Sequence, residues 1–119
     1  MPLTNYYYLG MKFGTHRDYD LNEIKAWCGE KVSVELNELY SNRYTLKKPM
    51  PITLVYEDNS YVIMQDSLNV WAEERTLVDT ERAIAQEIIA LYERLSGIDK
   101  SKLGPYPKEL LSFLRNYIS

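Results

Sequence analysis

Residues 52–96 read ITLVYEDNSYVIMQDSLNVWAEERTLVDTERAIAQEIIALYERLS, and their periodicity changes partway along. The first half alternates apolar and polar residues and is rich in β-branched and aromatic types, a pattern typical of half-buried strands. The second half spaces its apolar residues by three and four positions, as one face of a helix requires. The stretch therefore predicts three short strands followed by one amphipathic helix.

Two short polar segments divide the first half into strands. Asp and Asn favour turns, because their side chains bond to the turn backbone and tolerate left-handed angles. Connections this short join antiparallel neighbours, so the three strands should form a meander. We place the strands at residues 52–56, 61–64 and 68–72, and the turns at Asp58-Asn59-Ser60 and Asp66-Ser67.

The predicted helix carries signals at both ends. Thr76 and Asp79 have the spacing of a capping box. Gly97 stands where a left-handed C-terminal cap belongs, and Ile98 would close the accompanying apolar contact. A three-stranded sheet needs a cover for its apolar face, and this helix supplies a matching stripe. We expect the core to include Ile63, Ile84, Ile88 and Leu91.

The residues before Pro51 give weaker signals. The aromatic-rich segment 6–13 indicates a strand, and a capping box predicts a short helix over residues 21–28. Residues 32–36 alternate as a strand does, but they also fit a helical stripe; we favour the strand. Pro49 and Pro51 block helix formation and favour extended backbone ahead of the first strand of the meander.

The C-terminal residues and the chain length complete the fold prediction. Pro105 suits the first turn of a helix over residues 105–118, which has a stripe of leucines. A chain of 119 residues is one domain's worth. We therefore predict a single α+β domain over residues 1–119. It consists of an antiparallel β-meander packed against one amphipathic helix, a C-terminal helix, and an N-terminal segment, residues 1–48, of undecided strand or helix content.

The composition argues against several classes of protein. The formal net charge of −3 gives no basic footprint for nucleic acid, although Arg43, Lys47 and Lys48 suggest a local basic patch. No apolar run approaches the roughly 18–20 residues of a membrane helix, and a secretory signal pattern is lacking. Cys28 is the only cysteine, which fits a reducing compartment. We expect a cytoplasmic protein that binds neither membrane nor, directly, nucleic acid.

The sequence offers few parts for catalysis or metal binding. His16 and Cys28 are the only formal nucleophile pair, and a lone cysteine in a predicted helix is more often a buried apolar residue. Asp18 and Asp20 lack the glycine and distal glutamate of a calcium loop, and one His with one Cys gives no zinc set. We expect no catalytic residue, no metal and no cofactor, and hence not an enzyme.

What remains is a surface for binding. Trp71 shares one face of its strand with Asn69 and Glu73, which favours an outward ring, although burial in the core is the plainer alternative for a large aromatic. Aromatic side chains and arginine are common anchors of protein interfaces. We nominate Tyr61, Trp71 and Arg75 as partner-binding residues, while Arg75 also fits a solvated loop charge.

Three motifs follow one another along the chain in a familiar order. They are the hairpin Tyr56-Glu57-Asp58-Asn59-Ser60-Tyr61-Val62, the strand Leu68-Asn69-Val70-Trp71 and the helix start Thr76-Leu77-Val78-Asp79-Thr80. Together they resemble the HicB-like antitoxin domain over residues 51–96, a unit described as a partial ribonuclease-H-like fold. The chain departs at Glu74-Arg75, where members usually carry a glycine, and at Thr80, where they tend to carry alanine.

The resemblance implies a protein that neutralises a small, basic, RNA-cleaving toxin by covering its active site. Many members add a DNA-binding domain, which we do not expect because only one helix follows residues 51–96. The residues themselves leave a second hypothesis open. Exposed strand edges would pair two copies of the chain into a non-catalytic structural or regulatory homodimer.

Overall fold

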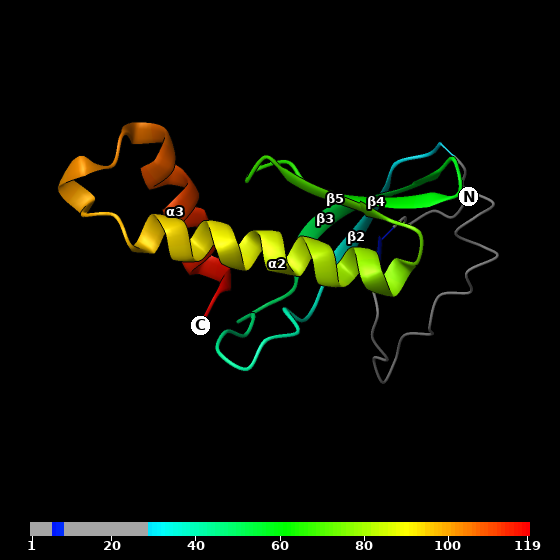
Figure 1. Cartoon of the computed structure of the whole chain (residues 1–119), viewed down its shortest axis with the longest axis horizontal. Coiled ribbons are helices and arrows are strands. Elements are labelled where there is room, and N and C mark those ends of the chain that lie inside the picture. The colour runs from blue at the N-terminus through cyan, green and yellow to red at the C-terminus, as the bar shows by residue number, and fades with distance from the viewer. Residues whose placement is uncertain (1–5, 9–28) are drawn as a thin grey trace.

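The computed structural model describes residues 6–8 and 29–119. Within them the strands form one sheet in the order β1-β2-β3-β4-β5, and the helices follow in the C-terminal half (Figure 1). The elements are β1 (Tyr6–Tyr8), β2 (Val32–Leu36), β3 (Met50–Glu57), β4 (Ser60–Gln65), β5 (Val70–Glu74), α2 (Leu77–Ser96), the short 3₁₀ helix η1 (Lys100–Lys102) and α3 (Pro105–Tyr117).

The sheet confirms the predicted meander and places part of the N-terminal segment beside it. Strands β2 to β5 pair antiparallel with their neighbours in sequence, whereas β1 pairs parallel with β2. The alternation of residues 32–36 therefore belongs to a strand, as we favoured, and not to a helical stripe. The predicted helix over residues 21–28 and most of the predicted strand over residues 6–13 lie outside the described residues.

The turn between β3 and β4 has the geometry that its sequence predicts. Asp58 and Asn59 both have positive φ, at 53° and 61°, and Glu57 pairs with Ser60 across a two-residue loop. Loops with two residues of positive φ match the natural twist of paired strands, and Asp and Asn tolerate that backbone better than most residues. The local chemistry thus fixes the register of this hairpin.

The third strand of the meander begins two residues later than predicted, at Val70. The cause is a wider turn closed by Gln65. Its side-chain Nε2 donates to the Pro51 carbonyl at 2.7 Å, and its Oε1 accepts from the Leu68 N–H at 3.2 Å. Asn69 then takes a positive φ of 54°. Gln65 is 3% exposed, so these bonds satisfy a buried amide.

Helix α2 starts as predicted and ends differently. The Thr76 hydroxyl accepts from the Asp79 N–H at 3.1 Å. The expectation of a left-handed cap at Gly97 is wrong, because Gly97 has φ −81° and donates its N–H to the Glu93 carbonyl in a further right-handed turn. Ile98 is 41% exposed and therefore does not bury itself as the expected closing contact.

The core lies between the sheet and the two long helices. All four residues chosen from the sequence belong to it, and the leucines of α3 join it. Figure 1 shows the strands beside the N-terminal half of α2 and α3 beside its C-terminal half. No helix in the described part of the chain is both long and apolar enough to cross a bilayer.

Candidate functional site

The sheet has one face toward α2 and a second face that we call the outer face. Side chains alternate between the two, and the buried Tyr61, Ile63 and Gln65 of β4 place that set on the α2 side. Val62 and Met64 consequently lie on the outer face. The strand positions of the outer face on β3 to β5 are Pro51, Thr53, Val55, Glu57, Ser60, Val62, Met64, Trp71 and Glu73.

Trp71 is the most prominent side chain of the outer face. It lies directly opposite Met64, which in turn lies opposite Thr53, so these three form one row across the sheet. Trp71 is 64% exposed, which confirms the outward ring and rules out the alternative of burial in the core. A tryptophan this exposed on a strand is unusual, because large aromatics are mostly buried.

The neighbouring row of the outer face contains two valines and a glutamate. Val55 pairs with Val62, and Val62 pairs with Glu73. Glu57, two positions beyond Val55 on β3, faces the same way, and both glutamates are exposed. The strand positions of the outer face on β3 to β5 include no lysine or arginine. Val55 is buried, so the exposed apolar area of the outer face comes from Trp71 and the half-buried Val62 and Met64, beside the two exposed glutamates.

Tyr61 does not belong to this surface. It shares its face of β4 with Ile63, as the sequence indicated, but that face is the one α2 covers, and Tyr61 is only 2% exposed. Its ring lies 4.8 Å from that of Tyr56, centre to centre, and burial raises the pKa of its phenol. The expectation of Tyr61 as an exposed anchor is thus wrong, and its role is packing.

Arg75 lies in the short connection between β5 and α2, two residues beyond the outer-face residue Glu73. Its side chain is exposed and forms no ion pair within the part of the chain that the structure describes. Arg75 is therefore an exposed residue four positions after Trp71 in the sequence. Of the three nominated residues, two are exposed and one is core.

A buried carboxyl of α2 contacts the loop after β2. Glu81 of α2 is fully buried, and its Oε1 accepts a hydrogen bond of 3.3 Å from the Tyr40 hydroxyl. Its Oε2 has no hydrogen-bond partner in the structure. Burial raises the pKa of Glu81 to about 7, against the opposing effects of Tyr40 and the Arg82 charge.

A second set of contacts fastens the same loop further along α2. The Tyr44 hydroxyl donates to Glu93 Oε2 at 3.0 Å, and the Arg43 guanidinium lies 2.8 Å from that oxygen. The Tyr44 ring packs edge-on against Tyr92 at 5.5 Å. The loop is thus held on α2 at two places, and Glu81 and Tyr40 serve as one of its anchors rather than as a reacting pair.

The basic patch suggested by the sequence is engaged within the chain. Besides the pairing of Arg43 with Glu93, the Lys47 ammonium donates to the Arg115 carbonyl at 2.9 Å. Lys48 lies over the Tyr117 ring at 4.8 Å. These cations hold the segment before β3 against α2 and α3, which gives them a structural role.

The remaining sequence candidates do not assemble into a reactive centre that the structure shows. Among residues 6–8 and 29–119, no three His, Cys, Asp or Glu side chains gather as metal ligands. His16, Asp18, Asp20 and Cys28 lie outside the described residues. Comparison with protein-family models, with curated proteins and with solved structures gives no match for this chain.

Proposed function

We propose that this chain is a protein-binding module that captures a small basic protein on its outer face. The observation that carries the proposal is Trp71, which is 64% exposed on the edge strand β5 and lies opposite Met64. Tryptophan is the residue type most enriched among the side chains that dominate binding energies. Burying its ring against a partner removes a large apolar area from water, and this favours association.

The charge of the surface indicates the chemistry of the partner. Glu57 and Glu73 are exposed on the outer face, and the whole chain carries a net charge of −3. Opposite charge across an interface speeds encounter and disfavours wrong partners. A partner with a basic contact surface therefore fits the outer face better than an acidic one.

An antitoxin-like role is the specific form of this proposal. A protein that cleaves RNA must attract phosphates, so the surface around its active site carries positive charge. An acidic surface that includes an exposed tryptophan suits the covering of such a site. The resemblance of residues 51–96 to the HicB-like domain supports the same reading, and Trp71 lies within one of the motifs that carry it.

A structural or regulatory homodimer is the second candidate. Strand β5 lies at the end of the strand order, so its outer edge is unpaired in the described sheet. Such an edge is a template for a strand of another chain. Antiparallel pairing of two β5 strands centred on Ala72 would set Trp71 of one copy opposite Glu73 of the other on a shared outer face.

Co-expression distinguishes the two candidates. The full chain would be produced with the small basic protein encoded beside its own gene, and the mass of the product measured by size exclusion with light scattering. We expect a hetero-complex, and loss of RNA cleavage by the partner within it. Separate elution of the two proteins would contradict the proposal, and a stable dimer of this chain alone would favour the homodimer.

A further inference from the structure

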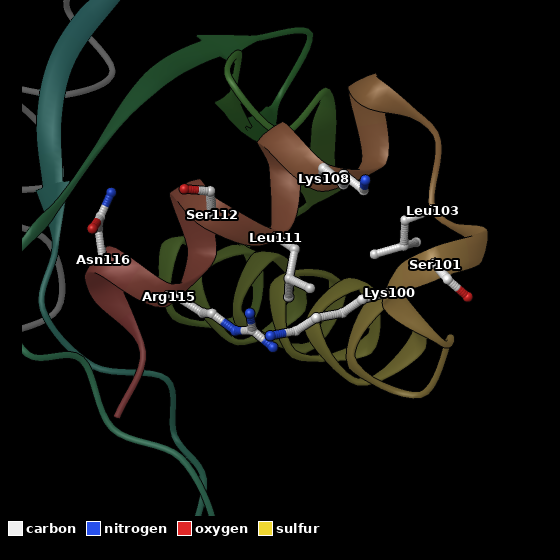
Figure 2. Close-up of a pocket in the computed structure, with 8 residues that line it drawn as sticks. All are labelled: Lys100, Ser101, Leu103, Lys108, Leu111, Ser112, Arg115 and Asn116. Atoms are coloured by element: carbon white, nitrogen blue, oxygen red, sulfur yellow. The ribbon is translucent and has the colours of Figure 1, made fainter.

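A basic pocket lies at the end of the molecule formed by η1 and α3, beside the C-terminal half of α2 (Figures 1 and 2). Its volume is about 540 Å³, within the range of pockets that hold small molecules. None of the outer-face residues lines it. The lining residues are Lys100, Ser101, Leu103, Lys108, Leu111, Ser112, Arg115 and Asn116.

Three cations and no carboxylate line this pocket. Figure 2 shows the side chains of Lys100 and Arg115 pointing toward one another, with Lys108 one helical turn or more away on α3. None of the three forms an ion pair with a carboxylate of the described residues. Bringing like charges together is unfavourable, and a bound anion offsets that cost.

Neither of the neighbouring acids lines the pocket or forms an ion pair with its cations among the described residues. Asp99 precedes Lys100, but its carboxylate accepts from the Ser101 N–H at 3.0 Å and so caps η1. Glu109 follows Lys108 and does not line the pocket. The whole chain has more acidic than basic residues, so a pocket lined by three cations is not a consequence of the overall composition.

The helix dipole explains only part of the excess. Arg115 is in the last turn of α3, where a cation is favoured by the partial negative charge of the helix end. Lys108 is near the start of the same helix, whose partial positive charge disfavours a cation. One face of α3 carries Lys108, Ser112 and Arg115, which all line the pocket. Lys108 keeps this place although the helix dipole disfavours a cation there.

The other lining residues suit a ligand with an uncharged part. Ser101, Ser112 and Asn116 offer hydroxyl and amide hydrogen-bond donors. Leu103 and Leu111 are buried beneath them and supply an apolar wall, and the Leu103 N–H donates to the Lys100 carbonyl and caps η1. Cationic and neutral donors around an apolar wall form the usual pattern of a site for a phosphorylated organic molecule.

We propose that this pocket binds a small molecule that carries a phosphate monoester. Arg115 and Lys100 hold the phosphate oxygens, since guanidinium and ammonium groups give short charge-assisted hydrogen bonds to phosphate. The hydroxyl and amide groups orient the ligand, and its organic part lies against Leu111. This site is independent of the outer face and does not rest on protein binding there.

Titration calorimetry on the full chain tests the site with three probes: a nucleoside 5′-monophosphate, the same nucleoside without phosphate, and inorganic phosphate. We expect saturable binding of the monophosphate, weaker binding of inorganic phosphate and none of the nucleoside. Replacing Arg115 by Gln should lower the affinity about tenfold or more, as the loss of a hydrogen bond to a charged group does. Lys102→Gln is the matched control, since Lys102 is an exposed cation of η1 that does not line the pocket.

Three outcomes would overturn the proposal. The first is no saturable binding of the monophosphate at millimolar concentration. The second is equal weakening by Lys102→Gln and Arg115→Gln, which would indicate diffuse attraction rather than a pocket. The third is saturable binding of a single-stranded RNA oligonucleotide alone, which would make the surface a contact for nucleic acid.

Discussion

The Tyr40 hydroxyl donates a hydrogen bond of 3.3 Å to Oε1 of Glu81 and so joins the loop after β2 to α2. Tyr40 itself has a positive φ of 53°, which is rare for a bulky residue. The Arg82 guanidinium lies over its ring at 4.9 Å. A strained backbone, a cation over an aromatic ring and a buried carboxyl thus meet at one anchor of the loop.

Stability should fall as the pH rises through the range in which Glu81 ionises. Its pKa is raised in the folded state from 4.5 to about 7, mainly by burial, with Glu38 also raising it and Tyr40 and Arg82 opposing. Above pH 4.5 the unfolded chain loses this proton while the folded chain keeps it, so unfolding is favoured. The free energy of unfolding should drop by about 3 kcal/mol by pH 7.5.

The variant Glu81→Gln should remove this pH dependence, because a neutral amide keeps the acceptor for Tyr40 without the charge. Urea denaturation of the parent and the variant between pH 4.5 and 7.5 measures the effect. Glu87→Gln, an exposed glutamate of the same helix, is the control. Parallel pH profiles for the parent and Glu81→Gln would contradict the assignment.

Gln65 should contribute to stability through the two bonds that close the turn before β5. Gln65→Leu preserves the volume but leaves the Pro51 carbonyl and the Leu68 N–H without that amide. We expect a loss of about 1–3 kcal/mol, because the Pro51 carbonyl loses this donor, whereas the Leu68 N–H keeps its bond to the backbone carbonyl of residue 65. Gln86→Leu on the exposed side of α2 should change stability by less than about 0.5 kcal/mol. Equal stabilities of the two variants would refute this role.

Ile88 tests the packing of α2 on the sheet. It has no exposed surface, and its replacement by alanine removes buried methyl and methylene groups and leaves a cavity. The expected loss is about 2–5 kcal/mol in chemical denaturation. Ile98→Ala is the control, since Ile98 is 41% exposed. A melting temperature of Ile88→Ala equal to that of the parent would contradict the placement of Ile88 in the core.

The variant Gly97→Ala distinguishes the left-handed cap predicted at the end of α2 from the right-handed conformation observed there. A left-handed cap would make alanine unfavourable by about 1 kcal/mol, because its side chain crowds the following carbonyl. At the observed φ of −81°, a Cβ would lie 3.4 Å from the Glu93 carbonyl oxygen, at ordinary contact distance. We expect Gly97→Ala to stabilise the protein by about 0.4–1 kcal/mol. A lower melting temperature than that of the parent would instead support the left-handed cap.

The sequence was sufficient wherever structure follows from neighbours along the chain. The alternation of β3 to β5, the Asp58-Asn59 turn and the Thr76 cap are all local, and the leucine stripe of α3 needs only its own period. These features needed no knowledge of distant contacts.

The errors arose where a distant segment determines burial. Glu81 looks like a solvent-facing helix residue until the loop carrying Tyr40 folds over it. Tyr61 was nominated for a binding surface, but the packing of α2 on its face of the sheet buries it. Lys100 meets Arg115 only because η1 turns the chain back onto α3. None of these contacts leaves a signal in local periodicity.

The affinity of Trp71→Ala for the basic partner tests the central claim most directly. Titration calorimetry would compare it with Tyr106→Ala, which removes an exposed aromatic from α3 and leaves the outer face intact. If Trp71 anchors the partner, its loss should cost about 2 kcal/mol or more, roughly a thirtyfold weaker affinity, with no effect of Tyr106→Ala. Unchanged affinity of a correctly folded Trp71→Ala variant would contradict protein binding through the outer face.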